Sequence, residues 1–474
     1  MTRRAFLNRG SALAAGLALG HSLHGGEKDA RPASRRPAPG QRRFTSEAVE
    51  ATIAEVTAAV PNPELAWLFA NCFPNTLDTT VAYAERDGRP DTFVITGDIH
   101  AMWLRDSTAQ VWPYVSLAPR DPGLQRLLAG VIHRQAECIL IDPYANAFND
   151  GPGTSPWAHD HTAMKPELHE RKWEVDSLCW PIRLAHGYWQ TTGDASVFDA
   201  RWKAAMELVI RTFREQQRKT NRGPYSFTRT TDWQPDTAPG GGWGNPIRPD
   251  GLIASIFRPS DDATTFPFLI PSNHFAAVAL QQLAGLAGGP AGDAALAGRA
   301  RELGAEVEAA LKAHGIAVHP KHGRIWAYEV DGFGNALFID DANLPSLLAL
   351  PYLGACPADD PLYGATRRFV LSDDNPWHFR GKFAAGVGGP HTGLDSIWPI
   401  ALTAQAMTST DDAEIVACLR MLVAGSAGTG FMHESFHKDD PQRFSRQWFA
   451  WANTFFGELV LHLFRSRPDL LRQV

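Results

Sequence analysis

The sequence predicts an all-α dominated fold in which helices close into a ring, with long loops and a few short strands. From residue 46 onward, apolar residues recur at helical spacing in one window after another. The windows are 46–60, 104–115, 123–140, 174–191, 197–217, 274–287, 292–313, 343–350, 394–408, 411–424 and 446–465. Strand-like runs occur at 92–95 and 324–329. Thr45 or Ser46 is expected to cap the first helix, because a hydroxyl there accepts a hydrogen bond from a free N–H group.

Three of the predicted helices begin with the same short pattern. The pairs are Asp106-Ser107 with Trp112-Pro113, Asp176-Ser177 with Trp180-Pro181, and Asp395-Ser396 with Trp398-Pro399. Asp is a good N-cap and Pro is tolerated in a first helical turn, so each Asp is expected to start a helix. Repeated starts favour a toroid of inner and outer helices, with the inner starts gathered around one pocket. Three ordinary capped helices would explain the caps equally well, but not the Arg, Asp, His and Trp in the flanking loops.

The N-terminal residues resemble an export signal followed by a linker. Arg3-Arg4 precedes an apolar run at 11–20, which is too short to span a bilayer stably but has the length of a signal-peptide core. We expect residues 1–24 to be a twin-arginine-type signal and the protein to be periplasmic or extracellular. No clean Ala-x-Ala site follows, so cleavage and retention as an anchor both stay open. Residues 25–43, rich in Pro, Gly and Arg, are expected to form a disordered linker, and 44–474 a single domain.

Composition limits the classes of partner. The net charge is −6 and no long basic block occurs, which argues against nucleic acid or an anionic membrane as the main partner. The 15 Trp are typical both of large cores and of sugar-binding clefts, where flat rings stack on pyranoses. The 5 Cys are scattered without CxxC spacing and are expected to be buried free thiols.

Six segments combine polar, aromatic and Gly residues more richly than packing requires. They are 97–106, 172–176, 258–262, 339–343, 389–395 and 432–437. Sugar hydroxyls both donate and accept hydrogen bonds, so a sugar pocket needs carboxylates, Arg, His and Asn in fixed orientations. Each segment alone is explained equally well by a salt bridge or a cap. Together the six favour a functional pocket.

Two carboxylates from distant segments are candidates for cleaving a glycoside. One carboxylic acid must protonate the leaving oxygen, and a second carboxylate acts on the other face of the sugar. Asp261 or Asp262 is a candidate for the acid and Glu434 for the second group. Adjacent aspartates raise one another's pKa, which helps to keep an acid protonated near neutral pH.

Zinc binding is the main alternative. Residues 433–437 match H-E-x-x-H, which on a helix places both His on one face with Glu as the base, and Glu458 lies where a third ligand could fall. However, Gly428 and Gly430 precede the motif and Pro441 soon follows, a poor context for a helix. A second possible metal cluster, at 159–161, is better explained as an exposed loop.

Taken together, six stretches resemble glycoside hydrolase family 125, whose members are exo-acting α-1,6-mannosidases. The stretches are TGDIHAMWLRDSTAQVWPY, KWEVDSLCWPIRLAHGYW, FRPSDDATTFPFLIPSNHFA, IDDANLPSLLALPYLG, GPHTGLDSIWPIAL and MHESFHKDDPQRFSRQWFAWANTFFGEL. They span about 97–459. The resemblance implies an (α/α)6 barrel for 44–474, an inverting mechanism without a metal or other cofactor, and α-mannoside glycans or oligosaccharides as partners.

The resemblance also implies roles for individual residues. By motif, Asp261 corresponds to the general acid, with Asp262 as the alternative, and Glu434 to the general base. Residues implied to bind substrate are Trp103, Arg105, Asp106, Asp176, Asn273, Asp340, Asp341, His391, Asp395 and His433. The H-E-x-x-H string lies inside a matching stretch, which argues further against zinc.

Two other functions stay open at this point. Helical toroids host several sugar chemistries, so a glucoamylase-like or trehalase-like hydrolase is an alternative that activity on glucosides would select. A periplasmic glycan-binding protein without catalysis is the third, and retained binding without turnover would favour it.

Overall fold

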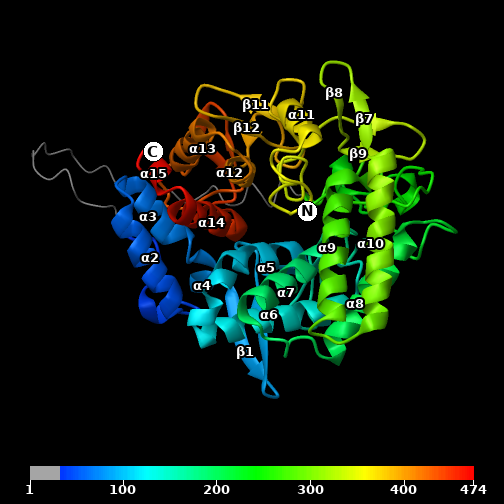
Figure 1. Cartoon of the computed structure of the whole chain (residues 1–474), viewed down its shortest axis with the longest axis horizontal. Coiled ribbons are helices and arrows are strands. Elements are labelled where there is room, and N and C mark those ends of the chain that lie inside the picture. The colour runs from blue at the N-terminus through cyan, green and yellow to red at the C-terminus, as the bar shows by residue number, and fades with distance from the viewer. Residues whose placement is uncertain (1–32) are drawn as a thin grey trace, which may run out of the picture.

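The computed structural model describes residues 33–474, which fold into a barrel of paired helices (Figure 1). Each pair joins an inner helix to the outer helix that follows it in the chain. The pairs are α5 (Leu104–Val111) with α6 (Pro122–Ile141), α7 (Cys179–Thr192) with α8 (Ala200–Gln216), α9 (Ile270–Gly288) with α10 (Ala294–His314), and α12 (Pro399–Met407) with α13 (Asp412–Gly425). The last inner helix, α14 (Ala450–Ser466), packs against α3 (Pro63–Cys72), which in turn packs on α2 (Glu47–Ala59).

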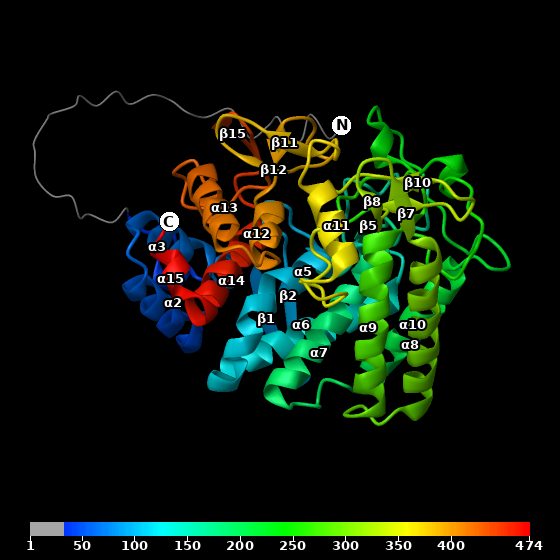
Figure 2. The ribbon, with the colours of Figure 1, turned by 45° about the horizontal axis from the view of Figure 1, so that its top comes forward.

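Burial separates the inner helices from the outer ones. Every residue of α5 is buried, as are most residues of α9, α12 and α14. By contrast, α10 and α8 bury one stripe each and expose charged residues on the other side. Neighbouring inner helices contact one another in the order α12, α14, α5, α7 and α9, and the views in Figures 1 and 2 show this arc. The predicted helical barrel is therefore confirmed.

The inner position between α9 and α12 is not a helix. Residues 343–353 run as successive turns, followed by the outer helix α11 (Pro361–Val370). The prediction of a helix at 343–350 is wrong, because the N–H groups of Leu347 and Leu348 donate to the side chain of Asp340, at 2.8 and 3.0 Å, rather than to preceding carbonyls. Pro345 and Pro351 also disfavour a helix here, since neither has an N–H group to donate.

Short strands connect the helices and form small sheets of two or three strands. The hairpins are β1 (Val81–Arg86) with β2 (Arg89–Val94), β7 (Ile316–His319) with β8 (Gly323–Trp326), and β11 (His378–Arg380) with β12 (Ala385–Val387). The three-stranded sheets are β3 (Met102–Trp103), β4 (Ala147–Phe148) and β5 (Leu168–Glu170); β6 (Phe268–Leu269), β9 (Glu329–Val330) and β10 (Ala336–Leu337); and β13 (Ser396–Ile397), β14 (Ser435–His437) and β15 (Asp440–Ser445). Strands β3, β6 and β13 directly precede α5, α9 and α12, so each of these sheets fixes the start of an inner helix. Expected strand 92–95 falls mostly in β2, and 324–329 is divided between β8 and β9.

The remaining elements are short. They are α4 (Asn75–Thr79), α15 (Pro468–Leu471) and the 3-10 helices η2 (Pro39–Gln41), η3 (Trp112–Arg120), η4 (Val175–Leu178), η5 (Gln234–Asp236) and η6 (Gly240–Gly242). None of the helices from 33 to 474 is both long and apolar enough to cross a bilayer. The five cysteines are free, and four of them are buried.

Helix capping follows the sequence at the first helix but not at the three repeated starts. Ser46 caps α2 by accepting a hydrogen bond from the N–H of Val49. Asp106 lies inside α5, Asp176 lies in η4, and Asp395 precedes β13, so none of the three caps a helix. The prediction of Asp N-caps is wrong here, because Asp106 and Asp176 are ion-paired with Arg105 instead.

Residues 33–43 are packed against the barrel, so the expectation of a disordered linker is wrong for them. The Trp67 Nε1–H group donates to the Ala33 carbonyl at 2.9 Å. The Arg36 guanidinium lies between Asp78, at 2.7 Å from Nε to Oδ2, and Glu50, at 3.0 Å from Nη1 to Oε2. Buried charges of opposite sign hold this segment where composition alone indicated a free chain. The expected signal at 1–24 and residues 25–32 lie outside the described residues.

Removing the Arg36 charge should destabilise the whole barrel. In Arg36→Ala the Asp78 carboxyl, which is 2% exposed, loses its main cationic partner. Breaking a buried ion pair typically costs about 3–5 kcal/mol, so we expect a lower free energy of unfolding by urea. Arg43→Ala, at an arginine with no ion pair among the described residues, is the control. Equal stability of Arg36→Ala and wild type would contradict a structural role for 33–43.

Candidate active site

A cavity of about 460 Å³ opens where the inner helices begin. Trp103 immediately precedes α5, Trp398 immediately precedes α12, and Phe449 immediately precedes α14. The lining residues are Thr96, Ile99, Trp103, Arg105, Asp106, Pro156, Trp157, His169, Glu170, Pro259, Ser260, Asp261, Asn343, His391, Trp398, Glu434, Arg446, Phe449 and Trp451. The predicted gathering of polar groups at inner-helix starts is therefore present, and aromatic rings form much of the wall.

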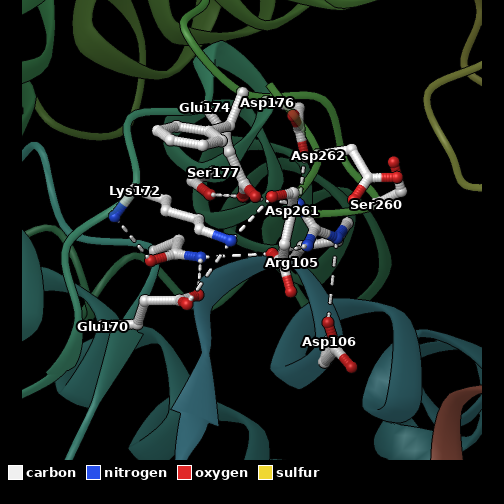
Figure 3. Close-up of polar contacts among 12 residues, drawn as sticks. Arg105, Asp106, Glu170, Lys172, Glu174, Asp176, Ser177, Ser260, Asp261 and Asp262 are labelled. Atoms are coloured by element: carbon white, nitrogen blue, oxygen red, sulfur yellow. Dashed lines mark hydrogen bonds and ion pairs between the residues drawn. The ribbon is translucent and has the colours of Figure 1, made fainter. Parts of the chain in front are cut away.

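At one side of this cavity the guanidinium of Arg105 is surrounded by carboxylates (Figure 3). Its Nη1 donates to Glu174 Oε2 at 2.7 Å and to Asp176 Oδ2 at 2.9 Å. Its Nη2 lies 3.6 Å from Asp261 Oδ1, and its Nε lies 3.8 Å from Asp106 Oδ2. Burial raises the pKa of Glu174 well above its ordinary value, and the charges of Asp261 and Asp176 add to this while Arg105 opposes it. One cation thus holds four acidic side chains, and burial disfavours the charged form of Glu174 among them.

Asp261 reaches the cavity from a strained turn. Its backbone φ is 65°, a left-handed conformation that Asp tolerates better than most residues. Lys172 fixes this turn, because its Nζ donates to the Asp261 carbonyl at 2.7 Å and to Asp236 Oδ1 at 2.6 Å. The carboxylate Oδ1 accepts a hydrogen bond from Asn146 Nδ2 at 3.2 Å. Both its backbone and its side chain are therefore held in place.

Asp262, the neighbouring aspartate, occupies a different environment. It is fully buried and does not line the cavity, whereas the Asp261 side chain is 15% exposed. Asp262 Oδ1 lies 3.4 Å from Nδ1 of His391, which does line the cavity. The left-handed residue turns the two carboxyls in different directions, so only Asp261 of the pair can meet a ligand directly.

Glu434 lies in the same cavity on a separate segment. Its Oε2 accepts a hydrogen bond from Ser445 Oγ at 2.9 Å, and its Oε1 lies 3.4 Å from Arg446 Nη1. Arg446 is held in turn by Asp98, with 2.9 Å from Nε to Oδ1, and by the Phe449 ring, whose centroid is 4.7 Å from the guanidinium carbon. The carboxylate is thus oriented by a hydroxyl and a fixed cation.

Four further predicted residues line the cavity: Trp103, Arg105, Asp106 and His391. The ring of Trp103 meets His169 edge-on, with centroids 5.4 Å apart. Asp106 accepts a hydrogen bond from Thr96 Oγ1 at 2.5 Å. Burial raises the pKa of Asp106 while the Arg105 charge opposes this. These side chains are positioned to contact a ligand in the cavity.

The structure places the other predicted substrate-binding residues away from the cavity surface. They are Asp176, Asn273, Asp340, Asp341, Asp395 and His433; none of them lines the cavity, and their binding of substrate stays a prediction. Most of them satisfy buried backbone or charged groups just behind it. Asn273 exchanges hydrogen bonds with the backbone of Ile253.

All of these six except Asp395 are deeply buried, and burial shifts the pKa values of Asp340 and His433 in opposite directions. Burial raises the pKa of Asp340 to about 8 and lowers that of His433 to about 4. Asp341 accepts a hydrogen bond from Ser260 Oγ at 3.0 Å, beside Asp261. Asp395 is an exposed partner of Lys438, at 2.6 Å.

The H-E-x-x-H residues do not form a metal-binding helix. Ser435–His437 is strand β14, in which side chains alternate, and the His433 ring stacks on Phe444 with centroids 3.7 Å apart. Glu458 accepts a hydrogen bond from the Tyr352 hydroxyl at 3.0 Å and does not line the cavity. At 159–161 both His are exposed, while Asp160 is buried against Arg229, which corrects the expectation of an exposed loop there. Between 33 and 474 no cluster of three or more His, Cys, Asp or Glu is arranged to hold a metal ion.

Several cavity residues were not singled out from the sequence, notably Trp157, Glu170 and Arg446. Trp157 lies over the guanidinium of Arg229, 3.7 Å from ring centroid to Cζ. Glu170 Oε1 accepts a hydrogen bond from Arg229 Nη2 at 2.9 Å, and its Oε2 accepts one from Asn146 at 3.0 Å. The available signal was charged residues next to aromatic ones, as in the RQWFAW run that Arg446 begins. Nothing local in the sequence shows that these three loops meet.

Comparison with known structures supports this reading of the fold. A bacterial glucoamylase solved with acarbose aligns with a TM-score of 0.56 at 12% identity, covering 90% of this chain and 59% of that one. At that identity the likeness concerns the fold alone. Two separately held carboxylates in the central cavity of such a barrel match what a glycoside hydrolase requires.

Sequence comparison specifies the family. The family described as "Metal-independent alpha-mannosidase (GH125)" matches residues 62–461. The Meiotically up-regulated gene 157 protein of Schizosaccharomyces pombe is 42% identical over 458 residues, 93% of this chain and 90% of that protein. A metal-independent α-mannosidase structure from Streptococcus pneumoniae, a non-productive complex with α-1,6-mannobiose, aligns with a TM-score of 0.86 at 44% identity, covering 90% of this chain and all of that one. The chain belongs to the GH125 family of metal-independent α-mannosidases.

Proposed function

We propose that the protein releases terminal mannose from α-1,6-linked mannosides with inversion at the anomeric carbon. The observation that carries this proposal is that Asp261 and Glu434, from segments far apart in the sequence, line one cavity and are each fixed by a different set of donors. The Streptococcus pneumoniae relative, solved with α-1,6-mannobiose, supports the choice of linkage. A cavity of about 460 Å³ suits a small saccharide end rather than the middle of a polymer.

In the proposed reaction Asp261 is the general acid and Glu434 the general base. Asp261 transfers its proton to the glycosidic oxygen as the bond from that oxygen to the anomeric carbon breaks. Glu434 removes a proton from a water whose oxygen bonds to the opposite face of the same carbon. The products are mannose and a shortened alcohol, and a later proton transfer from Glu434 to Asp261 through solvent restores the starting state.

The neighbours of each carboxylate fit these roles. When Asp261 loses its proton, the Arg105 guanidinium and the Asn146 amide stabilise the new negative charge. Arg446 and the Ser445 hydroxyl hold Glu434 in place while leaving its carboxylate exposed to the cavity. Asp106 and His391 are placed to accept or donate hydrogen bonds to sugar hydroxyls. Trp103, Trp398 and Phe449 provide the apolar faces.

Proton NMR during hydrolysis of α-1,6-linked mannobiose, with EDTA present, tests the proposed reaction. Water attack opposite the leaving group should give β-mannose first, with the α-anomer growing in only as mutarotation proceeds. Parallel incubation with an α-linked glucobiose is the matched control for sugar specificity. Initial release of α-mannose would contradict inversion. Activity that EDTA abolishes and zinc restores would contradict the two-carboxylate mechanism.

Substitution of the carboxylates should separate the acid from the base. We expect Asp261→Asn and Glu434→Gln each to lower kcat on mannobiose by about 10²–10⁴-fold, with Asp262→Asn as the control that keeps Asp261 intact. On an aryl α-mannoside with an acidic phenol as leaving group, Asp261→Asn should recover much of its rate, because that phenolate needs no proton. Glu434→Gln should recover none. If Asp262→Asn loses the rate and Asp261→Asn keeps it, the acid is Asp262.

Export by a twin-arginine route is part of the same proposal and rests on the sequence of residues 1–24 alone. In a bacterial host that carries this pathway, the full chain should give α-mannosidase activity in the periplasmic fraction. Because the thiols are free, the protein should fold before export, and an Arg3→Lys/Arg4→Lys variant should accumulate active enzyme in the cytoplasm. Unchanged fractionation of that variant would contradict the proposal.

A further inference from the structure

A second cavity, of about 400 Å³, lies apart from the catalytic one and shares no lining residue with it. Two loops form it: residues 218–222, just after α8, and residues 240–249, which begin with η6. Arg218, Lys219 and Arg222 contribute three cationic side chains from one five-residue stretch. No Asp or Glu lines this cavity. Its walls therefore differ in charge from those of the catalytic site.

Arg218 is buried without a carboxylate partner. Arg218 is 8% exposed, and it forms no ion pair with any acid in the described part of the chain. Its Nη1 donates to the Trp243 carbonyl at 2.8 Å and its Nε to Gln216 Oε1 at 3.2 Å, while Nη2 has no acceptor among the described residues. Burial lowers the pKa of Arg218 to about 10, with Arg222 adding to the effect, so the group is still charged at neutral pH.

Most other buried guanidinium groups in the described part of the protein have a carboxylate partner, and Arg183, which forms no ion pair there, lies over the rings of Trp112 and Tyr352 instead. Arg105 binds Glu174 and Asp176, and Arg258 binds Glu329 at 2.6 Å. Arg229 is bound by three acidic residues. Burying a charge costs free energy unless it is paired, so each of these arrangements has a carboxylate to offset the cost. Arg218 has no such carboxylate partner in the described part of the protein.

The two neighbouring cations, Lys219 and Arg222, add to the positive charge that would attract an anion. Arg222 is exposed, and its guanidinium carbon lies 6.0 Å from the centroid of the Trp243 ring. Lys219 hydrogen-bonds to Glu306, which offsets one of the three charges and leaves two. Guanidinium groups bind phosphate oxygens with paired N–H donors, and a cavity with two of them and no acid matches that chemistry.

We propose that this cavity binds a phosphate group, free or carried on a sugar. Arg222, exposed beside the cavity, would meet the phosphate oxygens first, and the guanidinium of Arg218, which also lines the cavity, would supply the inner positive charge. Trp243, Pro246 and Pro249 form an apolar wall next to these cations, which suits a pyranose ring that carries the phosphate. The inference is independent of the roles proposed for Asp261 and Glu434.

Isothermal titration calorimetry at constant ionic strength tests the site with two probes, sodium phosphate and mannose 6-phosphate, and with mannose as the uncharged comparison. Losing one charge-assisted contact should weaken phosphate binding about tenfold in Arg222→Gln, and Arg218→Gln should weaken it at least as much. The control is Arg368→Gln, an exposed arginine on α11. Mannosidase activity of Arg222→Gln should equal that of wild type, which shows that the variant is folded.

The outcomes separate the sources of the phosphate. Tighter binding of mannose 6-phosphate than of phosphate, lost in Arg222→Gln, supports a sugar phosphate as the ligand. Equal affinities, lost in the same variant, support a site for the free anion. Absence of binding heat with both phosphate probes, or affinities that neither Arg218→Gln nor Arg222→Gln changes, would overturn the proposal while leaving the catalytic mechanism unaffected.

Discussion

The polar centre of the barrel depends on the buried guanidinium of Arg105. It connects the start of α5 to Glu174 and Asp176, at the start of η4 just before α7, and to Asp261 in the loop before α9. Helices that meet at a pocket rich in acids would repel one another there, and this cation offsets the repulsion. Without it, carboxylates would be left buried and unpaired, which is among the costlier changes that a protein interior can undergo. The position of Asp261, the proposed general acid, is thus tied to the packing of the inner helices.

A second buried network extends this constraint to the loops. Lys172 holds the backbone of Asp261 and also binds Asp236, which binds Arg229. Arg229 in turn supports the ring of Trp157 on the cavity wall. Because each cation here bridges segments far apart in the sequence, the loops above the barrel behave as one packed layer. A change at Arg229 would therefore act on the turn that contains Asp261 and on the cavity wall together.

The sequence was informative wherever the signal is local. The helical spacing of apolar residues predicted most of the helices. The clustering of polar residues predicted a shared pocket, and Asp261 and Glu434 do line one cavity. The sequence was uninformative where a polar side chain forms hydrogen bonds with buried backbone groups. Asp340 and Asn273 were expected to bind sugar, yet they satisfy buried N–H and C=O groups, a need that only the folded chain reveals. Arg36 was assigned to a linker from composition, since its partner Asp78 is 42 residues away.

The irregular inner position between α9 and α12 shows why a barrel of helices needs an exception at its active site. A helix there would use its own carbonyls to satisfy the N–H groups of Leu347 and Leu348, whereas here Asp340 accepts both. Turns can instead direct neighbouring polar groups towards the cavity. Asn343 lines it, and Asp341 fixes Ser260 next to the catalytic turn. The buried Asp340 side chain is thus a structural substitute for helical hydrogen bonding, and the chain gains side-chain positions that a regular inner helix could not supply.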